Sequence, residues 1–163
     1  MSPLIFILLQ FSVLAYAALA GVFLAFSDFI MRSLARTSGT GGIEAMQIIN
    51  REVFRWVFMT LFLGMAAVSV LIVIYSTLHL AGGSRTLILL GALVYLLGCF
   101  AVTVFGNVPM NEALARMELS DEATRTYWTG TYLPRWTRWN SVRTLACALS
   151  AALVLFGLFQ QVH

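Results

Sequence analysis

Charged residues are scarce in this chain, and lysine is absent. Of the 163 residues, 10% are charged and 60% are hydrophobic, whereas about 25% of the residues in a soluble domain are charged. A composition this apolar excludes a soluble domain, and the mean hydropathy of +0.88 agrees with that conclusion. The chain is therefore expected to be an integral membrane protein.

Metal ligands and phosphate-binding motifs are also scarce. The two histidines, His79 and His163, and the two cysteines, Cys99 and Cys147, have no metal-ligand spacing, so we expect no metal site. We interpret both cysteines as small packing residues, because each lies inside a hydrophobic run. The glycine-containing segment 39–42 is too short for a phosphate-binding loop and follows no predicted strand.

Hydrophobic sequence, in contrast, is abundant and forms four long runs. The runs cover residues 4–26, 53–75, 86–105 and 142–159, and about 20 residues suffice for a helix to cross the hydrocarbon core. Helices are the expected spanning structure, because the runs show no alternating pattern typical of strands. The first run has no basic segment before it and is too long for a signal peptide, so we interpret it as a retained helix. We predict an all-α fold with a single transmembrane domain over residues 1–163, an integral membrane four-helix bundle with short interfacial helices in its two longer loops.

Arginine alone sets the predicted orientation. Nine of the ten basic residues lie in or beside the loops that join the first run to the second and the third to the fourth, and Arg85 stands alone in the remaining turn. Because cytoplasmic loops carry the excess of basic residues, we expect both longer loops in the cytoplasm and both termini outside, in a bacterial inner membrane. The net charge of +3 requires no nucleic acid as a partner, since loops that face anionic lipid carry such a charge.

Small residues recur at helical spacing within the runs and predict close packing of the helices. They are Ala17, Gly21 and Ala25 in the first run, Gly91 and Gly98 in the third, and Ala148 and Ala152 in the fourth. A compact bundle is the expected result. The glycine pair of the third run is also a candidate face for a homo-oligomer.

Each longer loop is predicted to contain a helix. Apolar residues at helical spacing over 43–53 predict a helix that runs straight into the second span. In the other loop, Ser120 is a favourable N-cap, and the helix that follows is expected to end before Pro134.

Amide and guanidinium groups gather where the spans meet these loops. Polar groups at this depth are costly and usually face an interior cavity, so we expect a polar pocket just inside the membrane surface. Alternatively, Asn107 and Asn140 are helix caps and Arg143 reaches lipid phosphates. The residues concerned are Asn50 and Arg51 at the second span, Asn107 and Asn111 at the third, and Asn140 and Arg143 at the fourth.

Four aromatic residues lie close to these groups in the sequence: Trp128, Tyr132, Trp136 and Trp139. One explanation is an aromatic belt at the lipid headgroups. Such a belt does not explain the amide and guanidinium groups beside these rings.

Several of these segments together resemble the DUF1772 membrane proteins, a family that includes the anthrone oxygenases. The resemblance extends over nearly the whole chain. One departure is Ser141, where members often have histidine. The segments that carry the resemblance are Phe26-Ser27, residues 42–50 ending in Met46-Gln47-Ile48-Ile49-Asn50, Asn107-Val108-Pro109-Met110-Asn111, and residues 136–144.

The resemblance implies a membrane-embedded oxygenase that oxidises an activated aromatic substrate, phenolic or anthrone-like, with O₂ and without a metal or organic cofactor. It also implies that guanidinium and amide groups hold the substrate oxygen, while aromatic rings stack on the polycycle. The catalytic candidates are Arg143, Asn111, Asn107, Asp28 and Glu44, and the substrate-binding candidates are Asn50, Arg51, Tyr132, Trp136, Trp139 and Asn140.

A general base is the least defined part of this hypothesis. Asp28, Glu44 and Glu112 are the carboxylates expected nearest the pocket, and burial would raise the pKa of such a group toward neutrality. Each of them could instead pair with an arginine. His79 is expected at the opposite membrane face.

Two other functions were considered. A transporter is disfavoured, because four spans without an internal repeat or a broken helix are too simple for one. The alternative that stays open is a non-catalytic membrane module that binds a hydrophobic ligand, a lipid or a partner subunit through the same pocket.

Overall fold

The computed structural model describes residues 1–53 and 55–162, and every regular element within them is a helix. The all-α prediction is therefore confirmed for the described residues. The elements are α1 (Pro3–Ala25), the π-helical segment η1 (Phe26–Ile30), α2 (Met31–Leu34), α3 (Gly41–Glu52), α4 (Trp56–His79), α5 (Gly82–Tyr95), the π-helical segments η2 (Leu96–Ala101) and η3 (Thr103–Asn107), α6 (Val108–Ala115), α7 (Glu122–Tyr127), the π-helical segment η4 (Trp128–Tyr132) and α8 (Leu133–Val162).

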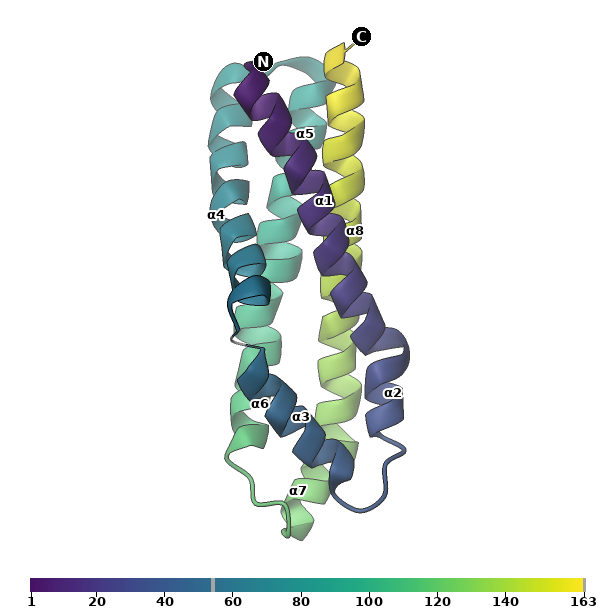
Figure 1. Cartoon of the computed structure of the whole chain (residues 1–163). Coiled ribbons are helices and arrows are strands. Elements are labelled where there is room, and N and C mark those ends of the chain that lie inside the picture. The colour runs from purple at the N-terminus through teal and green to yellow at the C-terminus, as the bar shows by residue number, and fades with distance from the viewer. Residues whose placement is uncertain (54, 163) are drawn as a thin grey trace.

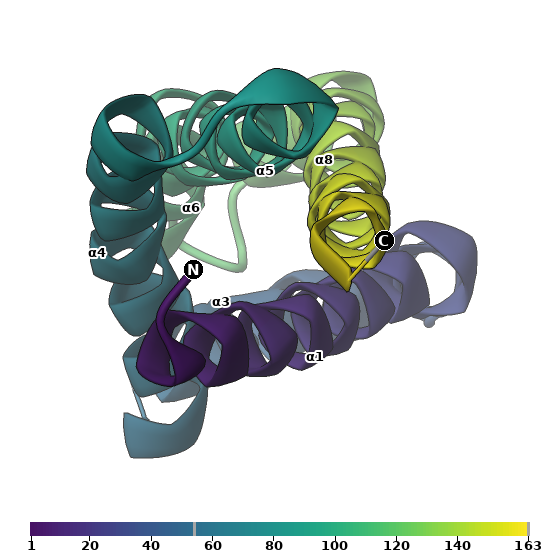
Figure 2. The same cartoon turned by 90° about the horizontal axis from the view of Figure 1, so that it is seen from above.

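Four continuous helices are long and apolar enough to cross a membrane, and they cover Pro3–Leu34, Trp56–His79, Gly82–Ala115 and Glu122–Gln161. They form a ring in the order α1, α4, α5, α8 (Figures 1 and 2). Within this ring α8 packs extensively against α1 and α5, whereas α1 packs only loosely against α4. The chain is an integral membrane helix bundle, as predicted.

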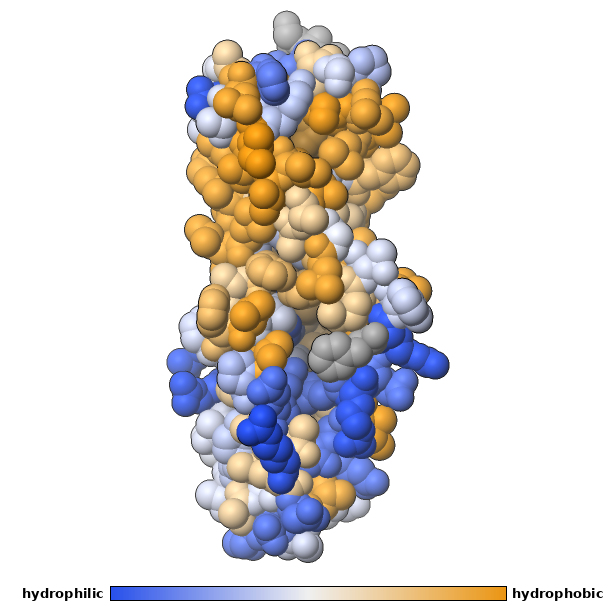
Figure 3. All heavy atoms as spheres, turned by 90° about the vertical axis from the view of Figure 1, so that its left-hand side faces the viewer, coloured by the Kyte–Doolittle hydropathy of each residue, from blue (hydrophilic) through white to orange (hydrophobic). Residues whose placement is uncertain are grey.

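The two ends of the bundle differ in what they carry. Both termini and the turn between α4 and α5 lie at one end, which we call the terminal end (Figure 1). The short helices α2, α3, α6 and α7 lie at the other end, which we call the loop end (Figure 1). On the face shown in Figure 3, apolar side chains form a band in the half toward the terminal end, and most polar side chains gather at the loop end.

Two hydrophobic clusters hold the fold together. The larger one lies between the four membrane helices. The smaller one packs the loop-end helices onto the bundle, and its buried members are Met31, Ile43, Met46, Leu114, Trp128, Tyr132 and Trp136.

Helix α3 does not run straight into the second span, so that prediction was wrong. It ends at Glu52, and the backbone of Arg55 is extended, with φ −71° and ψ 155°, before α4 begins at Trp56. The two helices bury different surfaces, which explains the break. Helix α3 is amphipathic and lies across the loop end with Met46 on its buried side, whereas α4 is apolar on all sides and crosses the membrane (Figure 1).

Pro134 does not end the helix that precedes it, contrary to the prediction. The segment η4 comes directly before it, and there the amide of Leu133 donates to the carbonyl of Trp128, five residues earlier. This wider turn accommodates the proline ring, which would clash with a carbonyl in a regular α-helical turn. Pro109 follows η3 in the same way.

The glycine pair of the third span packs inside the bundle, so it is not an exposed face for self-association. A Cβ atom on Gly91 would lie 2.8 Å from Cγ2 of Val154, and one on Gly98 would lie 2.7 Å from Cβ of Ala146. Both contacts join the third membrane helix to α8. The absence of a side chain at these positions allows the two helices to approach closely.

We predict that Gly98→Val destabilises the protein by about 1–3 kcal/mol, because the added methyl groups overpack this contact. Thermal unfolding in detergent measures the effect. Gly64→Val on α4 is the matched control, since a Cβ atom on Gly64 meets nothing within 4 Å. Equal unfolding temperatures for the two variants would contradict this account of the packing.

Candidate active site

Arg143 is buried between the membrane helices, where α8 faces α1 and η3. The residue is only 6% exposed. Its Nη2 donates to Oδ1 of Asn140 at 2.6 Å, and its Nη1 donates to Oγ1 of Thr103 at 3.3 Å. The guanidinium carbon lies 4.3 Å from the ring centre of Phe23 and 5.3 Å from that of Trp136. Arg143 therefore does not extend to the membrane surface as the alternative interpretation required.

No carboxylate balances this charge within residues 1–53 and 55–162. The two ion pairs found there, Arg55–Glu52 and Arg116–Glu112, are both exposed. The Nε atom of Arg143 is buried and has no hydrogen-bond partner. Burial of a cation is costly unless an anion accompanies it, so the rings and neutral oxygens around Arg143 offset that cost only in part.

Asn140 connects Arg143 to α1. Its Nδ2 donates to the carbonyl oxygen of Phe23 and to Oγ of Ser27, both at 2.6 Å. Oγ of Ser27 also accepts from Oγ of Ser141 at 3.0 Å. Asn140 is fully buried within α8, so the alternative that it caps the fourth span is wrong.

Asn107 is likewise not a helix cap, because its backbone is helical and its side chain makes no capping bond. The residue is 1% exposed, and its Nδ2 donates to the carbonyl oxygen of Trp136 at 3.2 Å. A carbonyl can only accept, so this contact fixes the orientation of the amide. The Oδ1 atom of Asn107 is then left buried without a partner.

Asn111 joins two aromatic side chains of the fourth helix. Its Oδ1 accepts from the hydroxyl of Tyr132 at 2.8 Å and from Nε1 of Trp136 at 2.7 Å. Nδ2 of Asn50, on α3, donates to the same tyrosine hydroxyl at 3.2 Å. These bonds join α3 to the third and fourth membrane helices at one level of the bundle.

The aromatic residues form a stack rather than a belt at the headgroups. The rings of Trp128 and Tyr132 are 5.3 Å apart at their centres, and those of Tyr132 and Trp136 are 6.1 Å apart, with interplanar angles of 21° and 17°. All three residues are buried. Trp139 differs, because it is 39% exposed and its ring lies over Gly106.

Two facing stripes of residues produce most of these contacts. Residues four apart lie on the same face of a helix, and one such stripe on the third membrane helix faces another on the fourth. We call the side chains that meet there, together with their partners on η1 and α3, the polar cluster. Its members are Ser27, Asn50, Thr103, Asn107, Asn111, Tyr132, Trp136, Asn140 and Arg143.

Sequence reasoning missed two members of the polar cluster, Ser27 and Thr103, as bonding partners. The four-residue spacing from Asn107 could have identified Thr103. Ser27 belongs to a segment that carries the family resemblance, but no sequence pattern indicated that it would face Asn140.

Several predicted site residues lie outside the polar cluster. Asp28, Glu44 and Arg51 are exposed, so the structure does not bring them to Arg143. Glu112 is exposed and pairs with Arg116 at 3.8 Å. The polar cluster therefore contains no carboxylate from the described residues that could act as a buried general base.

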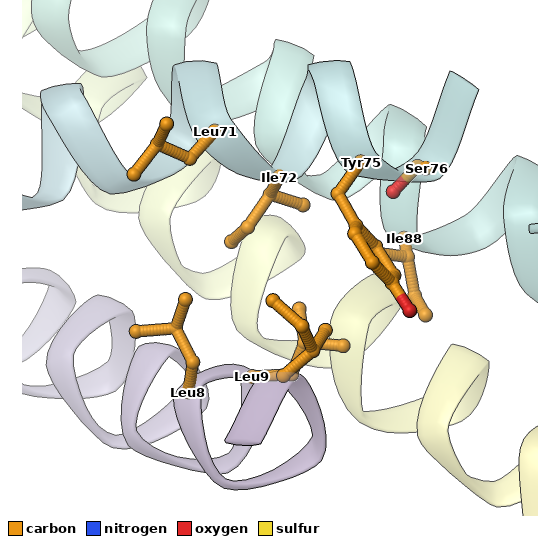
Figure 4. A pocket seen from close by; sticks show the side chains of 8 residues that line it. Leu8, Leu9, Leu71, Ile72, Tyr75, Ser76 and Ile88 are labelled. Atoms are coloured by element: carbon orange, nitrogen blue, oxygen red, sulfur yellow. The ribbon is translucent and has the colours of Figure 1, made fainter. Parts of the chain in front are cut away.

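Two cavities lie away from the polar cluster, toward the terminal end. The smaller one, about 10 Å³, lies between α1, α4 and α5 and is lined by aliphatic side chains together with Tyr75 and Ser76 (Figure 4). The larger one is a groove of about 620 Å³ between α1 and α8 with Gln10 in its lining. Neither matches the pocket lined by amides and guanidinium that the sequence predicted. At the polar cluster itself, the side chains of Phe23 and Trp136 pack directly against the guanidinium of Arg143.

Comparison with known proteins assigns the family. Residues 51–153 match the family model described as anthrone oxygenase. The chain belongs to the anthrone oxygenase family. No curated protein and no solved structure matches the chain. The range shared with the anthrone oxygenases contains both facing stripes of the polar cluster, and it begins one residue after Asn50.

We predict that Arg143→Met leaves the unfolding temperature unchanged or raises it, because methionine fills a similar volume and removes an unpaired buried charge. Asn140→Leu should destabilise the protein by about 1–3 kcal/mol, since it removes the acceptor for Arg143 and both bonds to the first membrane helix. Thermal unfolding in detergent compares the two variants. If Arg143→Met proves the more destabilising, the guanidinium is already fully satisfied in the free protein.

Proposed function

We propose that this protein is a membrane-embedded oxygenase that oxidises a phenolic or anthrone-like substrate with O₂. The observation that carries the proposal is the buried guanidinium of Arg143, which has an unpartnered Nε and no carboxylate partner in the described chain. Membership of the anthrone oxygenase family supports the reaction class.

An unbalanced cation in a low-dielectric site favours an anionic ligand. Coulomb attraction between unit charges is several-fold stronger near or inside a protein than in water. A substrate that binds as its conjugate base would therefore gain from Arg143, while its neutral form would not. This preference lowers the pKa of the bound substrate, because it stabilises the deprotonated form selectively.

Anthrone-like compounds suit such a site because their anions are aromatic phenolates. Loss of a proton from the methylene carbon gives the anion, which passes one electron to O₂. The substrate radical and superoxide then combine to form a C–O bond, and protonation gives a hydroperoxide. Loss of water converts that carbon to a carbonyl, so a CH₂ group and O₂ become C=O and H₂O. The substrate supplies all four electrons, and this route requires no external reductant.

In this proposal the energy for deprotonation comes from binding to Arg143. The carboxylates predicted as bases, Asp28 and Glu44, are exposed, and the proton passes to water rather than to a buried carboxylate. Ser141, at the position where members of the family often have histidine, lies 3.0 Å from Oγ of Ser27 and 3.0 Å from the carbonyl oxygen of Thr137, and its single hydroxyl hydrogen is donated to one of them. A serine hydroxyl is not a base near neutral pH, which agrees with a mechanism that depends on the cation.

The neighbours of Arg143 suggest how the substrate ring is held. The rings of Phe23 and Trp136 flank the guanidinium, so a flat polycycle could stack beside them while its oxygen meets Nε of Arg143. Oδ1 of Asn107, which lacks a partner, would accept from a hydroxyl or hydroperoxide of the bound molecule. Both atoms that lack partners would then be satisfied in the complex.

The test is oxygen consumption by the purified protein with anthrone, measured above the spontaneous rate. We predict that Arg143→Met lowers kcat/KM about 10²–10³-fold, the effect typical of losing one preorganised group that stabilises an oxyanion. Arg143→Lys should retain part of the activity, because it keeps the charge without the fork of donors. Arg138→Met is the matched control, since Arg138 is an exposed arginine on the same helix.

Two outcomes would contradict the proposal. Full activity of Arg143→Met would mean that the polar cluster is not the site. Saturable binding of anthrone under nitrogen, without oxygen uptake above the spontaneous rate in air, would favour the non-catalytic binding module.

A further inference from the structure

We propose that the substrate reaches Arg143 sideways from the lipid, between α1 and α4, and that Phe58 is the side chain that determines which ring systems can pass. This inference rests on the proposed function. It assigns a role to Phe58. This residue lies on the first turn of α4 and is not a member of the polar cluster.

The contact between α1 and α4 is the loosest around the ring of membrane helices. The two helices lie close together near the terminal end and diverge toward the loop end, where α1 runs on toward α8 (Figures 1 and 2). A buried hydrogen bond of 2.7 Å between the hydroxyls of Tyr16 and Ser69 joins them in the part where they are close. Phe58 lies eleven residues before Ser69 on α4, about 16 Å nearer the loop end.

Near the loop end, two aromatic rings fill the space between the diverging helices. The ring centres of Phe23 and Phe58 are 6.1 Å apart, with an edge-to-face angle of 87°. Phe58 also stacks on Phe62, one turn further along α4, at 6.0 Å and 3°. Phe23 in turn packs against the guanidinium of Arg143. Only one ring therefore separates Phe58 from the cation.

Phe58 lies at the boundary between the protein and the lipid. It is partly buried, while its neighbours Trp56 and Val57 are 88% and 85% exposed. An apolar aromatic molecule dissolved in the bilayer would contact this side of α4 first. Exchange of a Phe23–Phe58 contact for a contact with the incoming ring keeps every surface apolar, so the opening would expose no polar backbone to lipid.

The contacts of α8 with the third helix, its contact with the first helix near Arg143, and the loop end are more firmly closed. The contact between the third helix and α8 is interlocked at Gly91 and Gly98, and Asn140 ties α8 to the first membrane helix with two hydrogen bonds. At the loop end, α3 is packed onto α6 by the smaller hydrophobic cluster. Gln47 strengthens that contact, because its Nε2 donates to the carbonyl oxygens of Leu114 and Met117 at 2.8 and 3.0 Å.

The first experiment blocks the proposed route by covalent modification. Phe58→Cys is introduced into a Cys99→Ala/Cys147→Ala background, reconstituted in lipid vesicles and modified with N-phenylmaleimide. Oxygen consumption with anthrone is then measured before and after modification. We expect modification to lower kcat/KM at least tenfold while the unfolding temperature stays unchanged.

The matched control is Phe156→Cys in the same background. Phe156 lies on α8 toward the terminal end and is 58% exposed, so it offers a lipid-facing aromatic position away from the seam between α1 and α4. Modification there should leave kcat/KM unchanged. Equal activity of modified and unmodified Phe58→Cys overturns the access route but leaves the proposed function intact. No turnover by the wild-type protein overturns both.

A second pair of variants tests whether Phe58 selects by size without covalent modification. Phe58→Ala should raise kcat/KM for a tetracyclic naphthacenone relative to anthrone by about tenfold, whereas Phe58→Trp should lower this ratio. Because the readout is a ratio between two substrates, a general loss of folded protein cancels. A ratio that is the same in the wild type and in both variants would show that Phe58 does not lie on the route.

Discussion

The burial of the Arg143 guanidinium, with no carboxylate beside it in the described residues, is the constraint around which the polar cluster is arranged. In the lipid core no water is available to hydrogen-bond a guanidinium, so groups of the protein must accept its hydrogen bonds. Asn140 accepts from Arg143 and donates both of its bonds to the first membrane helix, while Thr103, on the third membrane helix, also accepts from Arg143. One cation thus links three of the four membrane helices. The contact remains incomplete, because Nε of Arg143 has no partner.

The π-helical segments explain how polar side chains reach that cation from different helices. Ser27 lies in η1, Thr103 and Asn107 in η3, and Tyr132 in η4. A π turn contains one more residue than the hydrogen-bonded α-helical turn, so it turns the following residues by about 100° relative to a regular helix. Such turns are frequent at functional sites. Here they aim polar groups inward on helices whose other faces must stay apolar for lipid.

This change of helical phase also explains how far the sequence could predict the site. Hydropathy was sufficient for the bundle, because four apolar runs of spanning length admit few other folds. The convergence of Asn107, Asn111 and Arg143 followed from their similar depth. The outward position of Asp28 could not be predicted, since the π-helical turn of η1 shifts the phase of the helix at this point. The continuation of the helix through Pro134 was missed for the same reason.

The absence of a buried carboxylate from the described part of the polar cluster shapes the chemistry that the site can perform. A buried acid beside Arg143 would neutralise the guanidinium and stabilise the free protein, but it would also compete with an anionic substrate. Without it, the cation remains available, and the binding free energy of the anion is the source of the pKa shift in the substrate. The site would then discriminate among aromatic molecules by acidity, because only those whose anions form readily could gain from Arg143. The unbalanced charge of Arg143 lowers the folding stability of the free protein, and binding of the anion offsets this loss. Such a trade-off between stability and binding is expected of a preorganised active site.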